Sequence, residues 1–423
     1  MGVIERNREM SLLRFATAGS VDDGKSTLVG RLLHDSKSVL SDQLESITRG
    51  APEHGTAAPD LALLTDGLRA EREQGITIDV AYRYFATPGR RFILADTPGH
   101  VQYTRNMVTG ASTADLAMVL VDARHGLVEQ TRRHAAVAAL LRVPHLVLVV
   151  NKMDLVGWSE QRFTEIVDEF VRYAASLGAG DVLAIPISAL EGDNVVVPSR
   201  HMDWYGGPTV LEHLETAPAD RDPAADPVRF PVQHVIRPQT PEHLDYRGYA
   251  GRLSSGTLRV GQRVTVLPSG LTSTVEAIDV LGEPAAVARA PQSVTVRLAD
   301  DLDVSRGDLL VPVADAPRPV REIEATACHL HERPLVAGQR VLLKHATRTV
   351  QAVVREVRHR LTPETLERSP APGGLEMNDI GGIVLRTAEP VPVDAYAESR
   401  ATGSLLLIDP GDGSTLTAAM ALP

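Results

Sequence analysis

A glycine-rich segment that ends in lysine and serine holds the first residues whose types and spacing could do chemistry. Its eight residues match the pattern GxxxxGK[ST] and precede Thr27: Gly19, Ser20, Val21, Asp22, Asp23, Gly24, Lys25 and Ser26. Glycines let backbone N–H groups approach phosphates closely, and the N-terminus of a following helix adds positive potential. In such a loop the lysine reaches the β- and γ-phosphates, and the serine hydroxyl ligates Mg²⁺. The pattern predicts a site for a nucleoside triphosphate.

A second motif, Asp96-Thr97-Pro98-Gly99, follows the apolar run FILAD at 92–96. An aspartate at the carboxyl end of a strand can hold Mg²⁺ through water, so we expect Ser26 and Asp96 to contribute to one metal site. The Gly99 amide can bond the γ-phosphate. Loss of that phosphate would then release the segment that follows.

A third motif selects the base. Asn151-Lys152-Met153-Asp154 ends the apolar run HLVLVV. The Asp154 carboxylate can accept from both N1–H and the 2-amino group of guanine, whereas adenine would leave it unpaired, so we expect discrimination on the order of 10⁴. After the next apolar run comes a loop whose backbone fits the guanine O6: Ser188, Ala189 and Leu190.

Alternating strand and helix patterns must position these motifs. The pattern at 12–19 predicts a strand, and short, continuous apolar runs of the kind that buried parallel strands show occur at 92–96, 116–123, 145–151 and 182–188. Helical patterns lie at 25–34, 129–141 and 160–176. This alternation predicts an α/β domain over 1–216, built on a doubly wound, mostly parallel sheet.

The pattern changes beyond residue 216. A stretch rich in Pro, Ala and Asp at 217–227 is typical of a linker. Short β-like runs broken by Gly and Pro follow, which predicts two small antiparallel β-barrels at 228–315 and 320–423.

Composition narrows the possible functions. The chain has 423 residues, 43% of them hydrophobic, a net charge of −11 and one cysteine, Cys328. No apolar run approaches the ~18 residues of a membrane span, so we expect no membrane partner and a cytoplasmic protein. The acidic total, with no basic run or tail, argues against a nucleic-acid partner. Lysine occurs only at positions 25, 37, 152 and 344, and two of these lie in the nucleotide motifs.

These motifs together resemble the GTPases of the translation-elongation-factor class, which have one GTPase domain followed by two barrels. The resemblance identifies 71–78 as the core of switch I, in which Thr77 completes the Mg²⁺ coordination. It implies that His100, directly after the second motif, positions the attacking water. Val21 and Ile76 match the apolar gate that flanks this histidine in the class. Lys25, Thr77 and His100 are thus the expected catalytic residues.

Within that class the chain resembles the GTP-hydrolysing subunit of the bacterial heterodimeric sulfate adenylyltransferase, through segments at 19–36, 63–85, 95–112, 151–156, 229–256 and 341–350. The resemblance implies that GTP hydrolysis drives formation of adenylyl sulfate and pyrophosphate from ATP and sulfate on a small catalytic partner subunit. The sequence agrees, because it contains neither an SGGxDS loop for adenylyl transfer nor a second phosphate-binding loop.

Two alternatives remain open at this point. One is an elongation-factor-type GTPase that delivers aminoacyl-tRNA, which the acidic charge and the extended matches disfavour. The other is a regulatory GTP-binding scaffold with little turnover, which the intact set of GTPase motifs disfavours.

Overall fold

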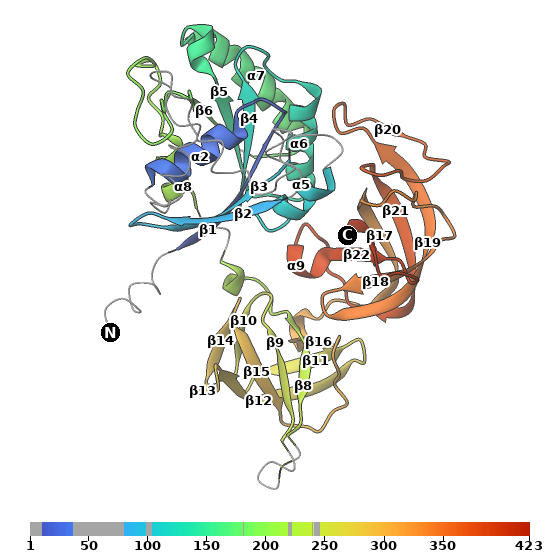
Figure 1. Ribbon diagram of the computed structural model, residues 1–423. Coiled ribbons are helices and arrows are strands. Elements are labelled where there is room, and N and C mark those ends of the chain that lie inside the picture. The colour runs from blue at the N-terminus through green and yellow to red at the C-terminus, as the bar shows by residue number, and fades with distance from the viewer. Residues whose placement is uncertain are drawn as a thin grey trace. The chain divides into compact units, whose positions relative to one another are not determined.

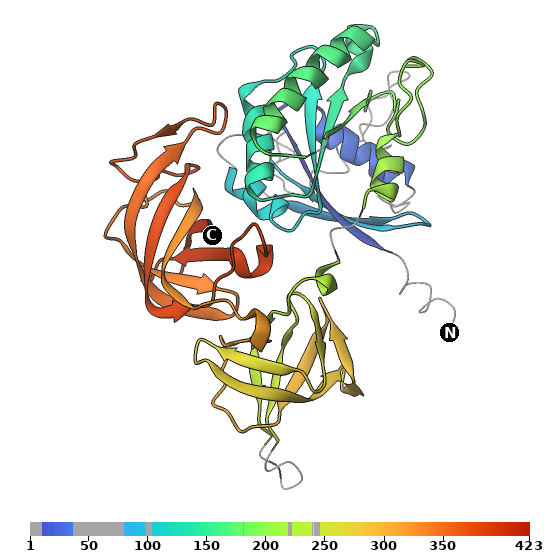
Figure 2. The same cartoon turned by 180° about the vertical axis from the view of Figure 1, so that it is seen from behind.

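The computed structural model describes residues 11–36, 80–98, 104–180, 182–218, 222–238, 240 and 246–423. The chain forms two compact units, one of Met1–Ala219 with Pro363–Leu366 and one of Asp220–Thr362 with Glu367–Pro423. Figures 1 and 2 show an α/β layered arrangement in the first unit and strands in the second. The domain boundaries expected from the sequence stay predictions.

A six-stranded sheet forms the centre of the first unit, in the order β2-β3-β1-β4-β5-β6. Its strands are β1 (Leu12–Gly19), β2 (Ala81–Ala86), β3 (Arg91–Asp96), β4 (Leu116–Asp122), β5 (His145–Asn151) and β6 (Val182–Pro186). All neighbours pair in parallel except β2, which runs antiparallel to β3 at one edge. The sheet is therefore mostly parallel, as the apolar runs predict.

Helices cover both faces of this sheet (Figure 1). They are α2 (Lys25–Asp35), α5 (Thr104–Ala111), α6 (Glu129–Leu140), α7 (Glu160–Ser176) and α8 (Val210–Thr216), with a 3₁₀ turn, η3 (Met153–Val156). One core packs α2 and α8 against the sheet, and a second core packs α6 and α7 against it. Burial on both faces explains why β4 and β5 are almost continuously apolar, and the doubly wound fold is confirmed.

The second unit begins with a 3₁₀ turn, η4 (Pro223–Ala225), inside the expected linker. An antiparallel β domain follows with strands β7 (Phe230–Pro231), β8 (His234–Ile236), β9 (Gly248–Arg252), β10 (Thr257–Arg259), β11 (Arg263–Leu267), β12 (Leu271–Val280), β13 (Glu283–Ala285), β14 (Val287–Arg289), β15 (Ser293–Leu298) and β16 (Leu309–Pro312). Its core is apolar and includes Phe230 and Tyr249. The 3₁₀ turn η5 (Val313–Asp315) ends this part of the chain.

A closed antiparallel barrel completes the second unit. Six strands form a ring in the order β18-β22-β23-β17-β21-β19, closed by pairing of β18 with β19. The elements are β17 (Val320–His329), β18 (Arg340–His345), β19 (Arg348–Leu361), β20 (Arg368–Ser369), β21 (Ile380–Val391), α9 (Arg400–Gly403), β22 (Ser404–Ile408) and β23 (Thr415–Ala421). Closure removes exposed sheet edges.

No helix among the described residues is long and apolar enough to span a membrane. Cys328 is buried and makes no disulfide.

Candidate functional site

The described motif residues meet at one edge of the parallel sheet. The phosphate-binding loop follows β1, Asp96 ends β3, the base-reading motif follows β5, and the 188–190 loop follows β6. Since β1 lies between β3 and β4 and runs parallel to both, these ends share one edge. Crevices at the carboxyl ends of parallel strands are where such sheets bind ligands.

Two residues with positive φ shape the phosphate-binding loop. Asp22 has φ 68° and Gly24 has φ 90°. A Cβ atom on Gly24 would lie only 2.3 Å from the Asn151 side-chain nitrogen. The Ser20 N–H donates to Asp23 Oδ2 at 2.6 Å and closes the turn. Glycine at position 24 is therefore required both by the backbone conformation and by the close approach of the base-reading motif.

Lys25 begins α2 and is buried inside the loop. Its ammonium donates to the Gly19 carbonyl at 2.7 Å. Burial lowers the Lys25 pKa, while the nearby carboxylates of Asp96, Asp23 and Asp22 oppose that effect. Burial likewise raises the pKa of Asp23. The loop thus holds a desolvated cation among carboxylates, an arrangement that can exchange its partners for phosphate oxygens.

The chemistry of the donors beside Lys25 fits Mg²⁺. Asp96 is 2% exposed, and its Oδ1 accepts from the Thr17 hydroxyl at 3.0 Å, which fixes the carboxylate at the end of β3. The Thr97 hydroxyl in turn donates to the Thr17 carbonyl at 2.5 Å. Ser26 supplies a hydroxyl from the first turn of α2. Mg²⁺ prefers such oxygen ligands and keeps several waters, so these few protein donors suit it.

Asn151 ties three loops together. Its side-chain nitrogen donates to the Asp23 carbonyl at 2.8 Å. Its side-chain oxygen accepts from the N–H groups of Lys152, at 2.8 Å, and Ala189, at 2.9 Å. One buried amide therefore fixes the phosphate loop, the base-reading motif and the 188–190 loop relative to one another.

Asp154 provides an acceptor that the fold leaves open. Its Oδ1 is buried and accepts no hydrogen bond among the residues that the structure describes. A buried acceptor without a donor costs about 1–3 kcal/mol, so such an atom in a native protein needs a reason. A ligand that presents two adjacent N–H donors, as guanine does, would satisfy this carboxylate.

The 188–190 loop is held by its side chains and carbonyls. Ser188 is fully buried, and its hydroxyl accepts from the Glu191 N–H at 3.3 Å. Arg31 of α2 donates to the carbonyls of Ala189, at 3.3 Å, and Leu190. The Leu190 side chain is exposed. The loop therefore presents backbone groups in a fixed position at the sheet edge.

Four of the expected residues lie outside the described part of the chain: Ile76, Thr77, Gly99 and His100. Val21, the other member of the expected apolar gate, is described and is 40% exposed. An apolar side chain this exposed on the phosphate loop is available to contact another group.

Comparisons with known proteins agree with this geometry. Residues 10–244 match the Elongation factor Tu GTP binding domain, and residues 322–422 match the GTP-eEF1A C-terminal domain-like family. The "Sulfate adenylyltransferase subunit 1" of Citrobacter koseri is 50% identical over 402 residues, which cover 94% of this chain and 84% of that protein. The chain belongs to the sulfate adenylyltransferase subunit 1 family.

Other relatives support this family. The subunit 1 of Shewanella oneidensis is 49% identical over 423 residues, covering 99% of this chain and 86% of that one. The "Bifunctional enzyme CysN/CysC" of Mycobacterium tuberculosis is 55% identical over 413 residues, covering 97% of this chain and 67% of that protein. A solved structure of sup35 complexed with GMPPNP is 26% identical with a TM-score of 0.44, and the match covers 98% of this chain and 94% of that one.

Sequence reasoning missed three residues of the site in this family member: Thr17, Arg31 and Asp122. Asp122 ends β4, is 2% exposed and bonds Lys152. The sequence carried a signal for it, because an acidic residue at the end of an apolar strand is the same pattern that identified Asp96. Thr17 and Arg31 carried no such signal, since their partners lie 79 and 158 residues away in sequence.

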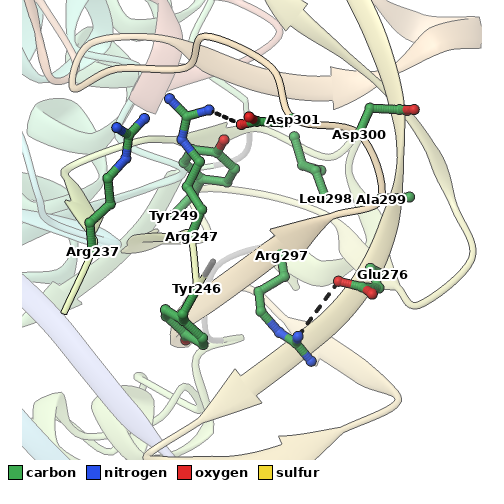
Figure 3. A pocket seen from close by; sticks show the side chains of 10 residues that line it. All are labelled: Arg237, Tyr246, Arg247, Tyr249, Glu276, Arg297, Leu298, Ala299, Asp300 and Asp301. Atoms are coloured by element: carbon green, nitrogen blue, oxygen red, sulfur yellow. Dashed lines mark hydrogen bonds and ion pairs between the residues drawn. The ribbon is translucent and has the colours of Figure 1, made fainter. Parts of the chain in front are cut away.

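A separate cavity of about 750 Å³ opens on the first β domain of the second unit (Figure 3). Its lining includes Arg237, Tyr246, Arg247, Tyr249, Glu276, Arg297, Leu298, Ala299, Asp300 and Asp301. Arg247 pairs with Asp301, and Arg297 lies 3.6 Å from Glu276. These pairs give a mixed charge rather than the basic surface that a nucleic acid would favour.

Proposed function

We propose that this chain is the GTP-hydrolysing subunit of a sulfate adenylyltransferase. It binds and hydrolyses GTP, and hydrolysis drives the formation of adenylyl sulfate and pyrophosphate from ATP and sulfate on a partner subunit. The observation that carries this proposal is the open Asp154 acceptor beside a complete phosphate-binding loop, in a chain about half identical to subunit 1 proteins over almost its whole length.

Base selection rests on Asp154 and the loops that Asn151 joins. The Asp154 carboxylate accepts from guanine N1–H and the 2-amino group, while the backbone of 188–190 faces O6. The N–H of Ala189 donates to Asn151 Oδ1, which holds this loop in place beside the base-reading motif. Adenine presents an acceptor at N1 and has no 2-amino group, so it would leave the buried carboxylate unpaired.

The phosphates bind along the loop of Gly19–Thr27. Lys25 exchanges its loop carbonyl for the β- and γ-phosphate oxygens, and Ser26, Thr77 and Asp96 hold Mg²⁺. When bound, Mg²⁺ neutralises charge that develops on the phosphates. The Gly99 N–H bonds the γ-phosphate and links its loss to the segment that follows. Thr77 and Gly99 enter by resemblance, because they lie outside the described residues.

His100 orients the water that attacks the γ-phosphate, with Val21 and Ile76 as the apolar gate beside it. The support for these roles is the position of His100 directly after Asp96–Gly99 and the match to the elongation-factor class of GTP-binding domains. Positioning of water in line with the phosphorus lowers the entropic cost of the reaction.

Adenylyl transfer belongs to the partner. The sequence contains no SGGxDS loop of the ATP-pyrophosphatase type. The designation "subunit 1" of the relatives implies a second chain in their assemblies. We therefore propose a heterodimer, or a higher assembly of it, with a small catalytic adenylyltransferase subunit that binds ATP and sulfate.

A pyrophosphate-release assay tests the proposal. ATP and sulfate are supplied with and without GTP, to the full chain alone and to its complex with the co-purified partner. We expect release only from the complex, and stimulation by GTP. Co-purified tRNA without pyrophosphate release would instead support the aminoacyl-tRNA carrier, and a GTP-binding complex that never turns GTP over would support the regulatory scaffold.

A further inference from the structure

Asp122 lies at the end of β4 directly beside the end of β5, since Asp122 and Asn151 are register partners. Both of its carboxylate oxygens are engaged. Oδ1 accepts from the Arg124 N–H at 2.9 Å and from Arg124 Nε at 3.1 Å, and Oδ2 accepts from Arg124 Nη2 at 2.7 Å. The Lys152 ammonium lies 2.9 Å from Oδ2. A buried carboxylate thus joins two cations at the edge that holds the base-reading motif.

Lys152 is held at both ends. Its backbone is in the left-handed region at φ 64°, and its N–H donates to Asn151 Oδ1. Its ammonium donates to the Asp22 carbonyl and pairs with Asp122. Its Cε would lie 4.0 Å from a Cβ on Gly24, so the aliphatic stem runs beside the phosphate-binding loop. The stem is therefore stretched across the site between the strand end and the loop.

We propose that Asp122 is a positioning residue for nucleotide recognition, which acts by holding the Lys152 side chain across the guanine site. The inference rests on the proposed function and adds a residue to its specificity apparatus. A free lysine side chain has many accessible rotamers, and binding would otherwise have to offset the entropy lost on ordering it. Fixing it before the nucleotide arrives lowers the cost of binding.

The contact between Asp122 and Lys152 depends on the negative charge of the carboxylate as well as on the size of the side chain. Burial works against ionisation, but hydrogen bonds from Arg124 and Lys152 hold its pKa well below the usual range. An asparagine at this position would keep the size but would replace one acceptor oxygen with an NH₂ group facing cations. Asp122→Asn should therefore release Lys152 without creating a cavity.

The test compares GTP hydrolysis by the full chain, in complex with its partner, for wild type, Asp122→Asn, Lys152→Gln and the double variant. We expect each single change to raise KM for GTP about tenfold, the typical effect of losing one hydrogen bond to a charged group, while kcat stays within about twofold. The double variant should be no worse than the worse single variant, because both changes remove the same interaction. Asp412→Asn, at an exposed aspartate of the second unit, serves as the matched control with wild-type constants.

Three outcomes would overturn the inference. One is a wild-type KM in Asp122→Asn. Another is a fall in kcat with KM unchanged, which indicates loss of folded protein. The third is an Asp122→Asn effect that adds fully to the effect of Lys152→Gln and that a further single variant, Arg124→Gln, measured in the same assay, reproduces. If Asp122→Asn fails to fold, Lys152→Gln still tests the pair, because the Lys152 side chain is 23% exposed and its replacement leaves no buried charge of its own. If the wild-type complex does not hydrolyse GTP, the proposed function fails and this inference with it; a failure of the inference alone leaves GTP hydrolysis by the wild type intact.

Discussion

At the scale of single residues, we predict that replacement of Asp154 changes which base the chain prefers. Asp154→Asn should shift the preference of the chain from GTP toward xanthosine triphosphate by on the order of 10³ or more, because an amide donates to the 2-oxo group where the carboxylate accepted from the 2-amino group. Competition binding of GTP and xanthosine triphosphate measures the shift. Asp203→Asn, at an exposed aspartate of the same unit, should leave it unchanged. Retained preference for GTP in Asp154→Asn would refute the base-reading role.

A second residue-scale prediction concerns His100. His100→Ala should lower the rate of GTP hydrolysis about 10²- to 10⁴-fold, the range typical of a lost proton-handling or water-positioning group. GTP affinity should change less than threefold, since the side chain is expected to contact water rather than the nucleotide. Single-turnover hydrolysis and equilibrium binding separate the two effects. A loss of affinity that accounts for the whole loss of rate would count against the role.

At the scale of elements, the junction between the phosphate loop and α2 depends on Gly24. Gly24→Ala adds a methyl group 2.3 Å from the Asn151 side-chain nitrogen, at a φ of 90°. We expect GTP affinity to fall at least about tenfold, because the amide that joins the loops must move. Gly178→Ala is the matched control, since it also has a positive φ but meets no atom within 4 Å. The control should cost about 1 kcal/mol of unfolding free energy and leave GTP binding unchanged. Equal effects of the two changes on binding would contradict the argument.

Elements also explain which parts of the site the sequence could predict. β4 and β5 are continuous apolar runs and β1 is mostly apolar, so the ends of these strands, and hence the phosphate loop and the base-reading motif, were predictable. β2 was not, because its alternating residues AYRYFA are partly exposed on one face. Neither α5 nor α8 was predicted, as each spans two turns or so and offers little periodicity. The Asn151 link between three loops depends on contacts 38 and 128 residues apart, which no local pattern encodes.

At the scale of the whole molecule, one buried ion pair joins the two β domains of the second unit. Arg229 donates to both oxygens of Asp394 at 2.9 Å, and both side chains are 7% exposed. Arg229→Met should reduce the free energy of unfolding by about 3–5 kcal/mol, because it leaves a buried carboxylate unpaired. Arg229→Met with Asp394→Asn removes that charge and should recover much of the loss. Urea unfolding of the full chain measures both, and an equally large loss in the double variant would contradict the ion-pair explanation.

The same pair predicts how the stability of the second unit depends on pH. Burial opposes ionisation of Asp394, but hydrogen bonds from Arg229 and Thr402 outweigh it and lower its pKa. Its folded pKa lies below the unfolded value of about 3.9, so the stabilisation is complete above that value and is lost as pH falls through the folded pKa. The Nε2–H of His345 donates to the Thr402 carbonyl at 2.7 Å, and burial of this imidazole lowers its pKa. The unfolded imidazole gains a proton more readily than the folded one, so the stability that depends on neutral His345 begins to fall as the pH drops below about 6.5. This pH range is separate from that of Asp394.

Unfolding free energies measured from pH 7 to pH 3 distinguish the two groups. Wild type should lose stability in both windows. The Arg229→Met and Asp394→Asn double variant should keep the slope near pH 6, to which His345 contributes together with the other histidines of lowered pKa, such as His134 and His329, and lose part of the slope below pH 4. If the double variant and wild type had the same slope below pH 4, protonation of Asp394 would not be what weakens the contact between the two β domains.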